Sequence, residues 1–272
     1  MIYFAGRELA QKLSYLKSQS KELNLSINYP KFVEPLVKFY ISLFGIPEIG
    51  LQERFNFLEN CMNKVSGKVI VDAGCGSGIN VRYVANKFPR SKIYAFDIEN
   101  KLIKLNRKIT KQKNIVFINH DLTKPLSQLK NKVDVLYCID VLEHIKNYQQ
   151  VLKVFNTWIK KNGYLIIHVP LPHQKRWFNF FKTWSHKTHH HEGIKEKKLI
   201  KLLKDYQIIL RQPTFGAIGS LIWEINTLLF KSSSLVAAIF YPFLRLLLFT
   251  DRYIFSKKYN CIGIVLKKNG KN

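Results

Sequence analysis

The sequence predicts an α/β protein with a parallel sheet covered by helices on both faces, and three observations support this fold class. The apolar residues Val69, Ile70 and Val71 lead directly into a glycine-rich turn over 74–78, and a helical pattern follows the turn. Apolar segments of strand length then alternate with helical segments as far as Pro170. Polar residues follow several of these strands, at the edge of a parallel sheet where ligands bind.

The expected elements follow one another in a regular order. Helices fill residues 1–65, where apolar residues recur every three or four positions and prolines separate the segments. From residue 66 onward the alternation of strand and helix implies crossover connections that place helices on both faces of the sheet. After the first strand we expect strands at 92–97, 115–118, 133–139, 163–169 and near 207–211, and helices at 101–113, 149–160 and 195–204.

Asp97 ends the second expected strand and indicates a nucleoside ligand. It lies about 20 residues beyond the glycine turn, where an acidic side chain accepts hydrogen bonds from both hydroxyls of a ribose. The glycines let a ligand approach the backbone, and the following helix offers it free N–H groups. A solvated aspartate beside a tight turn is one alternative, and a nicotinamide dehydrogenase is another. The turn reads G-x-G-x-G rather than G-x-G-x-x-G, which counts against the dehydrogenase.

Five successive segments resemble the motifs of class I S-adenosylmethionine-dependent methyltransferases, in the small-molecule group that contains ubiquinone-biosynthesis-type enzymes. They are VDAGCGSG, FDIE, NHDL, CIDVLEHI and GYLIIHVP, and the resemblance covers residues 65–212 and a last strand at 259–267. It implies a Rossmann-like, doubly wound, seven-stranded and mostly parallel sheet whose last strand is antiparallel. It also implies S-adenosyl-L-methionine as the cofactor.

The same resemblance assigns residues to the cofactor site. The implied set is Asp72, Gly74, Gly76, Gly78, Ile139 and Asp140 for the methionyl part, Asp97 for the ribose, and Ile98, Asp121 and Leu122 for the adenine.

Methyl transfer from a sulfonium needs a base only when the acceptor must lose a proton, as a hydroxyl does. Side chains near the fourth and fifth strands supply candidates, and we predict the catalytic set Glu143, His144, His168 and His189, with His191 behind them. The segment at 140–144 reads D-x-x-E-H, and some related O-methyltransferases hold a metal with E-x-x-E-H and a later histidine. Asp140 is one methylene shorter than the glutamate of that motif. We therefore predict no metal, with Asp140, Glu143, His144 and His189 as the alternative ligand set.

The chain carries a strong positive charge of +26, with a pI near 9.9. Such a protein associates with polyanions such as nucleic acid, anionic lipid or acidic glycan, although a lysine-rich genome would produce the same excess. The four cysteines stand singly, so neither a zinc ribbon nor a disulfide framework is indicated. No secretory signal is recognisable, and we predict a cytoplasmic protein with peripheral attachment to the inner face of the membrane.

Residues 213–250 form an unusually apolar region between the last two expected strands. Glu224 interrupts its first half, and Pro242 and Arg245 interrupt its second, so neither half is long enough to span a bilayer. We expect two apolar helices joined by a serine-rich turn. Contact with an anionic membrane through 213–258 is the favoured role, and a lipid pocket, a dimer face and a buried hairpin are the alternatives. The expected domains are a helical cap at 1–65, a core at 66–212 and 251–272, and this insert.

Together these inferences predict an S-adenosylmethionine-dependent methyltransferase with a small, membrane-associated or lipid-linked acceptor and oxygen as the favoured acceptor atom. An RNA or nucleotide methyltransferase is the first alternative, since the basic stretch 101–132 suits phosphates. No separate RNA-binding module and no N-P-P-Y-like motif supports it. A non-catalytic cofactor-binding partner subunit is the second alternative, and the intact glycine turn with Asp97 argues against it. The oligomeric state is left open.

Overall fold

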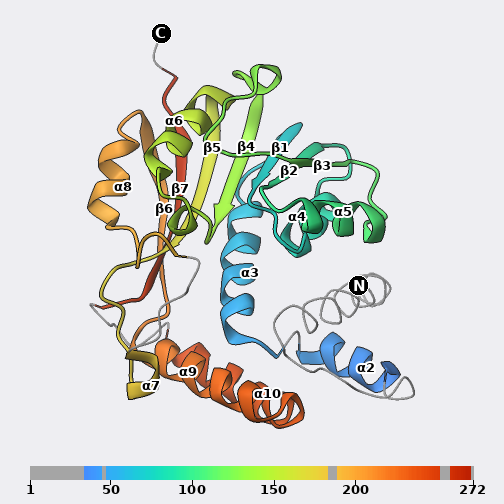
Figure 1. Cartoon of the computed structure of the whole chain (residues 1–272), viewed down its shortest axis with the longest axis vertical. Helices are drawn as coiled ribbons and strands as arrows, with labels where there is room; N and C mark the ends of the chain where they lie inside the picture. Colours follow the sequence, from blue (N-terminus) through green and yellow to red (C-terminus); the bar gives the residue numbers. More distant parts are fainter. Residues whose placement is uncertain (1–33, 45–46, 183–188, 252–257, 271–272) are drawn as a thin grey trace. The chain divides into compact units, whose positions relative to one another are not determined.

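The computed structural model describes residues 34–44, 47–182, 189–251 and 258–270 (Figure 1). The chain forms two compact units. Among the described residues, the helical unit comprises 34–44, 47–53, 176–182 and 216–251, and the sheet unit comprises 54–175, 189–215 and 258–270. The helices predicted within 1–33 lie outside the described residues. The predicted division into cap, core and insert stays a prediction.

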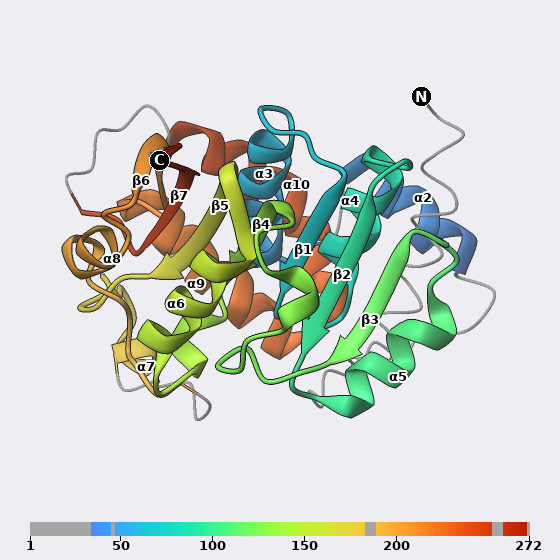
Figure 2. The same ribbon diagram turned by 90° about the horizontal axis from the view of Figure 1, so that it is seen from above.

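The sheet unit is built on one seven-stranded sheet, in the order β3-β2-β1-β4-β5-β7-β6 (Figure 2). β7 pairs with β5 on one side and β6 on the other, and both pairings are antiparallel, whereas the four remaining pairings are parallel. The predicted mostly parallel sheet with an antiparallel last strand is therefore confirmed. The strands are β1 (Val69–Ala73), β2 (Lys92–Asp97), β3 (Ile115–Asn119), β4 (Val133–Ile139), β5 (Ile159–Pro170), β6 (Tyr206–Thr214) and β7 (Cys261–Lys268).

Helices cover both faces of this sheet, as the alternation of elements predicts. One core joins α3, α4 and α5 to the sheet through residues such as Phe57, Val81 and Ile103. The other core joins α6 and α8 through residues such as Trp158 and Leu199. Neighbouring residues of a strand enter opposite cores because side chains alternate across a sheet. The helices are α3 (Ile49–Met62), α4 (Ile79–Lys87), α5 (Asn100–Ile109), α6 (Tyr148–Trp158) and α8 (Glu196–Leu202), with short 3₁₀ turns at Ser127–Leu129 and Leu142–His144.

Several element boundaries differ from the sequence prediction by a few residues. α5 ends at Ile109, before the predicted end at 113, and Thr110 has an extended backbone. β5 begins directly after α6, because Ile159 already pairs with Val133 of β4. β6 extends to Thr214 because it pairs with β7 along its full length. Pairing across the sheet therefore set these strand ends, which local sequence patterns did not define.

The helical unit contains α2 (Glu34–Phe44), α7 (Asn179–Lys182), α9 (Ala217–Ser232) and α10 (Ser234–Asp251), and α3 begins in it. α9 and α10 form a hairpin whose turn is centred on Ser233. The Asp251 carboxylate at the end of α10 accepts hydrogen bonds from Gly216 N and Ile218 N, which lie at the start of α9. The buried Glu224 carboxylate accepts bonds from the N–H groups of Trp177 and Phe178.

Hydrogen bonds between polar side chains and backbone N–H groups close the hairpin and connect it to the rest of the unit. The Asn226 amide oxygen accepts a hydrogen bond of 3.0 Å from Ile49 N, at the first turn of α3. Within the part of the chain that the structure describes, no helix combines the length and the apolar character needed to cross a bilayer.

Candidate functional site

The glycine-rich turn connects β1 to α4 in the predicted position. Gly74, Gly76 and Gly78 have φ angles of 90°, 48° and 74°, in the left-handed region that favours glycine. The N–H groups of Gly74 and Cys75 both donate to Phe96 O in β2. The turn is thereby held against the end of the neighbouring strand, and α4 begins immediately after Gly78.

A small open space lies at the middle glycine of this turn. A Cβ atom built on Gly76 would meet no atom within 4 Å, whereas one built on Gly74 would stand 2.3 Å from the Val141 side chain. A Cβ on Gly78 would similarly collide with Asn106, whose Oδ1 would be 2.4 Å away. Gly74 and Gly78 are therefore required by packing within the protein, while Gly76 leaves room for another molecule.

Asp97 stands at the end of β2 beside the glycine turn, as predicted. Its Oδ2 atom accepts a hydrogen bond of 2.7 Å from Gly76 N, and its Oδ1 atom accepts one of 2.9 Å from Glu99 N. The next residue, Ile98, is 68% exposed, which is unusual for a large aliphatic side chain. A carboxylate with remaining acceptor positions next to an exposed apolar surface suits a sugar and a flat aromatic base.

Asp72 lies inside β1 and is almost fully buried. Its Oδ2 atom has no hydrogen-bond partner among the described residues. Burial raises the pKa of Asp72 to about 8; the Tyr137 hydroxyl beside it opposes this rise, and the charge of Asp97 adds to it. A buried carboxyl oxygen without a partner at this edge suits a ligand that brings its own cation or donor.

The remaining predicted adenine contacts follow β3. Asp121 Oδ1 accepts hydrogen bonds from the backbone N–H and the hydroxyl of Thr123, and these bonds lower the pKa of Asp121. Leu122 is buried in the core that contains α6. Ile139, the last residue of β4, is half-buried. These residues lie at the same carboxyl edge of the sheet as Asp72 and Asp97.

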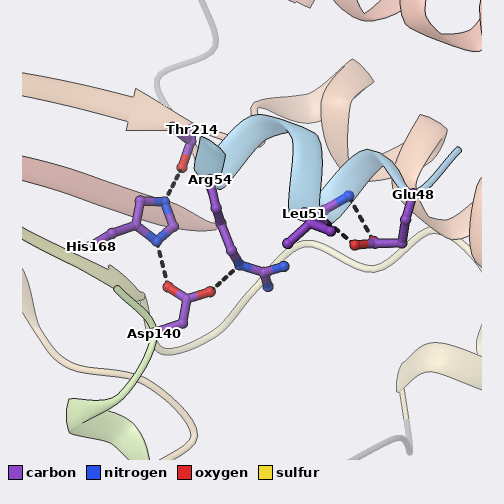
Figure 3. Close-up of polar contacts among 7 residues, drawn as sticks. Glu48, Leu51, Arg54, Asp140, His168 and Thr214 are labelled. Carbon is purple, nitrogen blue, oxygen red and sulfur yellow. Dashed lines mark hydrogen bonds and ion pairs between the residues drawn. The ribbon is translucent and has the colours of Figure 1, made fainter. Parts of the chain in front are cut away.

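Asp140, at the end of β4, belongs to a chain of polar contacts drawn in Figure 3. Its two carboxylate oxygens pair with the Arg54 guanidinium from α3 and with Nδ1 of His168 from β5. The other ring nitrogen of His168, Nε2, lies 2.9 Å from the Thr214 hydroxyl at the end of β6. Although burial opposes the effect, Arg54 and His168 hold the pKa of Asp140 below its usual range.

This arrangement defines the role of His168 within the protein. The side chain is fully buried, and both ring nitrogens face protein atoms. His168 therefore orients Asp140, and its geometry offers no nitrogen to an incoming acceptor. Asp140 has a φ of 51°, a conformation that costs energy for a residue with a side chain, and the contacts to Arg54 and His168 hold it there.

Glu143, His144 and His189 form a second cluster in the sheet unit. One ligand atom from each residue lies within 4.8 Å of the other two, and the two imidazole rings meet edge to face with centroids 4.4 Å apart. The Glu143 carbonyl oxygen accepts hydrogen bonds from His190 N and His191 N, which holds the segment after β5 beside the turn after β4. The structure thus brings together three of the four predicted catalytic residues.

The Glu143 side chain is buried, and its Oε2 atom has no hydrogen-bond partner among the residues that the structure describes. Burial raises the pKa of Glu143 well above its usual value, and the negative charge of Asp140 adds to the rise. A carboxyl group and two imidazoles at this spacing can accept a proton or hold a divalent cation. Asp140 is engaged by Arg54 and His168 and lies outside this cluster, although the alternative ligand set included it.

His191, the further residue predicted as a base, makes contacts outside this cluster. Its Nε2 atom lies 3.1 Å from Lys146 O, and its ring packs edge-on against Tyr148.

Arg54 and Thr214 are site residues that the sequence analysis missed. Arg54 is separated from Asp140 by 86 positions, and Thr214 from His168 by 46 positions. Neither belongs to a local motif, and both are chemically ordinary for a helix and a strand end. Only the pairing of β5 with β7 and of β7 with β6, together with the packing of α3, brings them to the strand ends.

Two curated relatives match less than half of the chain. The (S)-coclaurine N-methyltransferase of Papaver somniferum is 30% identical over 104 residues, which cover 37% of this chain and 29% of that protein. The malonyl-[acyl-carrier protein] O-methyltransferase 2 of Coxiella burnetii is 30% identical over 108 residues, which cover 40% of this chain and 43% of that protein. The chain therefore matches less than half of the length of each of these two relatives.

The fold also resembles a solved structure, the phosphoethanolamine N-methyltransferase 2 of Haemonchus contortus in complex with S-adenosyl-L-methionine. The TM-score is 0.57 at 15% sequence identity, over 80% of this chain and 52% of that one. A family model described as a methyltransferase domain matches residues 51–208, which is more than half of the chain. That span contains the glycine turn, Asp97 and the Glu143 cluster, and the chain belongs to this methyltransferase domain family.

Proposed function

We propose that the protein is an S-adenosylmethionine-dependent methyltransferase that methylates an oxygen atom of a small, membrane-associated or lipid-linked acceptor. The observation that carries this proposal is the arrangement of two sites in one sheet unit. The open glycine turn with Asp72 and Asp97 follows β1 and β2, and the Glu143, His144 and His189 cluster follows β4. Cofactor and acceptor sites at neighbouring strand ends are the arrangement that a transfer reaction needs.

The residues present fit S-adenosyl-L-methionine. In this proposal the buried carboxyl group of Asp72 faces the positively charged methionyl end, and the space at Gly76 admits the ligand. Asp97 accepts hydrogen bonds from the ribose hydroxyls, because each of its oxygens has a further acceptor position beyond the bond already made. Exposed Ile98 packs on the adenine ring. Asp121 and Leu122 line the adenine edge, and Ile139 and Asp140 line the methionine side.

The cluster after β4 favours oxygen over nitrogen as the acceptor atom. A neutral amine attacks a methyl group without losing a proton first, whereas a hydroxyl must release one. In the proposed step His144 or His189 accepts that proton, and the Glu143 carboxyl group, within 4.8 Å, is close enough to share it. The bound cofactor supplies a methyl group on a sulfonium, so the new O–C bond replaces a C–S bond and the sulfur leaves as a neutral thioether.

Labelled transfer into fractionated cell extract tests the proposal. The purified protein is incubated with methyl-labelled S-adenosylmethionine and with separate lipid, RNA and protein fractions. We expect label in the lipid fraction, and its loss in His144→Ala but not in the control His173→Ala, because His173 is an exposed histidine outside the cluster. Label in RNA would replace the proposal with a nucleic-acid methyltransferase. Tight cofactor binding with no label in any fraction would indicate a non-catalytic partner subunit.

A further inference from the structure

Helix α10 is apolar on both of its faces. Its buried face carries Ala237, Tyr241, Leu244 and Leu248. The opposite face carries Leu235, Ile239, Phe243 and Leu246 at spacings of three and four residues, and Leu235 and Leu246 are each 69% exposed. Further large exposed side chains on this helix are Phe240, Leu247 and Phe249. The buried face contributes to packing inside the protein. That packing does not account for the apolar residues on the exposed face.

Helix α2, in the same unit, carries a second exposed apolar face. Leu36, Phe39 and Leu43 recur at helical spacing and are all mostly exposed. Two contacts hold α2 to α10: the Tyr40 hydroxyl donates to Ala238 O, and Arg245 Nη1 donates to Phe44 O over 2.7 Å. We call the exposed apolar side chains of α10 and α2 the docking surface. Clusters of large exposed apolar side chains on a protein exterior mark sites of contact with a partner or a membrane.

The exposed charges of the α9–α10 hairpin favour an anionic partner. The acidic residues of the hairpin are engaged inside the unit, since Glu224 is fully buried and Asp251 accepts bonds from two backbone N–H groups. The cationic residues Arg245, on α10, and Lys231, at the end of α9 and over the ring of Phe180, are exposed. Exposed cations beside an apolar helix face are the combination that binds anionic lipid at the level of the headgroups.

A second copy of the chain suits this surface less well than a lipid bilayer does. Each copy carries a net charge of +26, so pairing two copies opposes a large like-charge repulsion. An anionic bilayer removes that repulsion and also accepts the apolar side chains. Arg245 interrupts the apolar run of α10. The helix is therefore suited to lie parallel to the membrane surface, at the level of the headgroups, and not to cross the bilayer.

We infer that α10 and α2 form a membrane-docking surface that seats the helical unit in the headgroup region of an anionic bilayer. This inference goes beyond the proposed transfer reaction and depends on no catalytic residue. It depends on the apolar faces of two helices and on the charges beside them.

Vesicle flotation tests the docking surface with the full-length protein. The vesicles are phosphatidylcholine alone or phosphatidylcholine with about one-third phosphatidylglycerol, an anionic fraction that attracts basic segments. We expect flotation with the anionic vesicles only, and a drop of about tenfold or more in the bound fraction for the double variant Ile239→Glu/Phe243→Glu. The matched control is the double variant Leu202→Glu/Ile208→Glu, which adds the same two charges at side chains of the sheet unit that are each 40% exposed.

Cofactor binding by calorimetry is measured in parallel, so that a misfolded variant is recognised. If the double variant loses cofactor binding, the milder Leu246→Ser variant replaces it in the flotation experiment. Flotation of the variants at the level of the unchanged protein overturns the inference, as does failure of the unchanged protein to float. A stable dimer in light scattering that the variants dissociate also overturns it, because a second copy then covers the surface. Loss of methyl transfer with flotation intact would oppose only the proposed function.

Discussion

The Asp97 Oδ2 atom accepts a hydrogen bond of 2.7 Å from the backbone N–H of Gly76. This contact ties the end of β2 to the middle of the glycine turn, at the glycine where the structure leaves open space. The carboxylate therefore has two functions in the proposed site, because it shapes the turn and also retains acceptor positions for a ribose. Loss of the side chain removes both functions together.

Replacement of Asp97 by alanine is expected to weaken S-adenosylmethionine binding by more than tenfold. That factor corresponds to about 1.4 kcal/mol or more, which is typical of a lost charge-assisted hydrogen bond. Calorimetric titration measures it. Glu99→Ala is the matched control, since Glu99 is an exposed acid two positions away. Equal affinity of Asp97→Ala and the unchanged protein would remove the ligand assignment.

Alanine at Gly76 and at Gly74 is expected to separate binding from folding. Both positions have positive φ, which costs alanine about 1 kcal/mol. At Gly76 the added Cβ meets no protein atom but fills the space that admits the ligand, so cofactor affinity falls while the fold persists. At Gly74 the Cβ collides with Val141, and stability falls by a further few kcal/mol. Urea unfolding and calorimetry distinguish the two variants, and an opposite ranking would contradict the geometry.

The stability of the cofactor-free protein is expected to decline as the pH rises from about 4 to about 8. The pKa of Asp72 is raised from 3.8 to about 8 in the folded protein, so over this range the folded state holds a proton that the unfolded state has released. The free energy of unfolding therefore falls with rising pH. In Asp72→Asn this part of the decline, on the order of a few kcal/mol, is expected to disappear. Urea unfolding at pH 5 and pH 8 provides the comparison, and parallel declines in both proteins would exclude the assignment.

Arg54 is expected to stabilise the folded protein through its contact with Asp140. In Arg54→Gln the Asp140 carboxylate loses a cationic partner, and we expect a loss of stability of about 1–3 kcal/mol. Because Arg54 and His168 lower the pKa of Asp140, the loss is expected near neutral pH and to shrink at acidic pH, where the carboxyl becomes protonated. A double-mutant cycle with Asp140→Asn measures the coupling. Additive effects of the two substitutions would show that the contact contributes nothing.

Chelation is expected to leave methyl transfer unchanged, since the proposal assigns Glu143, His144 and His189 to proton transfer. Glu143→Gln keeps the shape of the side chain and removes its ionisable carboxyl group, and we expect a fall of about 10²–10⁴-fold in rate with cofactor affinity preserved. Activity is assayed after EDTA treatment and dialysis. Activity that EDTA abolishes and a divalent transition metal restores would make the same three residues a metal site.

Local sequence patterns were sufficient to place the residues of the proposed cofactor side at one edge of the sheet. The glycine turn, Asp72 and Asp97 each belong to a strand end, and a parallel sheet brings strand ends to one edge. The placement of the residues of the proposed acceptor side was predicted less completely. Glu143 and His144 follow β4 directly, but His189 joins them only because Glu143 O accepts bonds from the N–H groups of His190 and His191. The predicted catalytic role of His168 does not suit its geometry, because no sequence pattern reveals that both ring nitrogens face protein atoms.

By itself, the sequence determined the strand order along the chain, the glycine turn, the acidic strand ends and the apolar character of α9 and α10. These features depend on residues that are close together in the chain, where side-chain period and backbone preference act directly. Tertiary structure alone decided that Arg54 and His168 hold Asp140, that Thr214 contacts His168, and which face of α10 is exposed. Those outcomes depend on contacts between residues far apart in the chain, which form only when the sheet and its helices pack together.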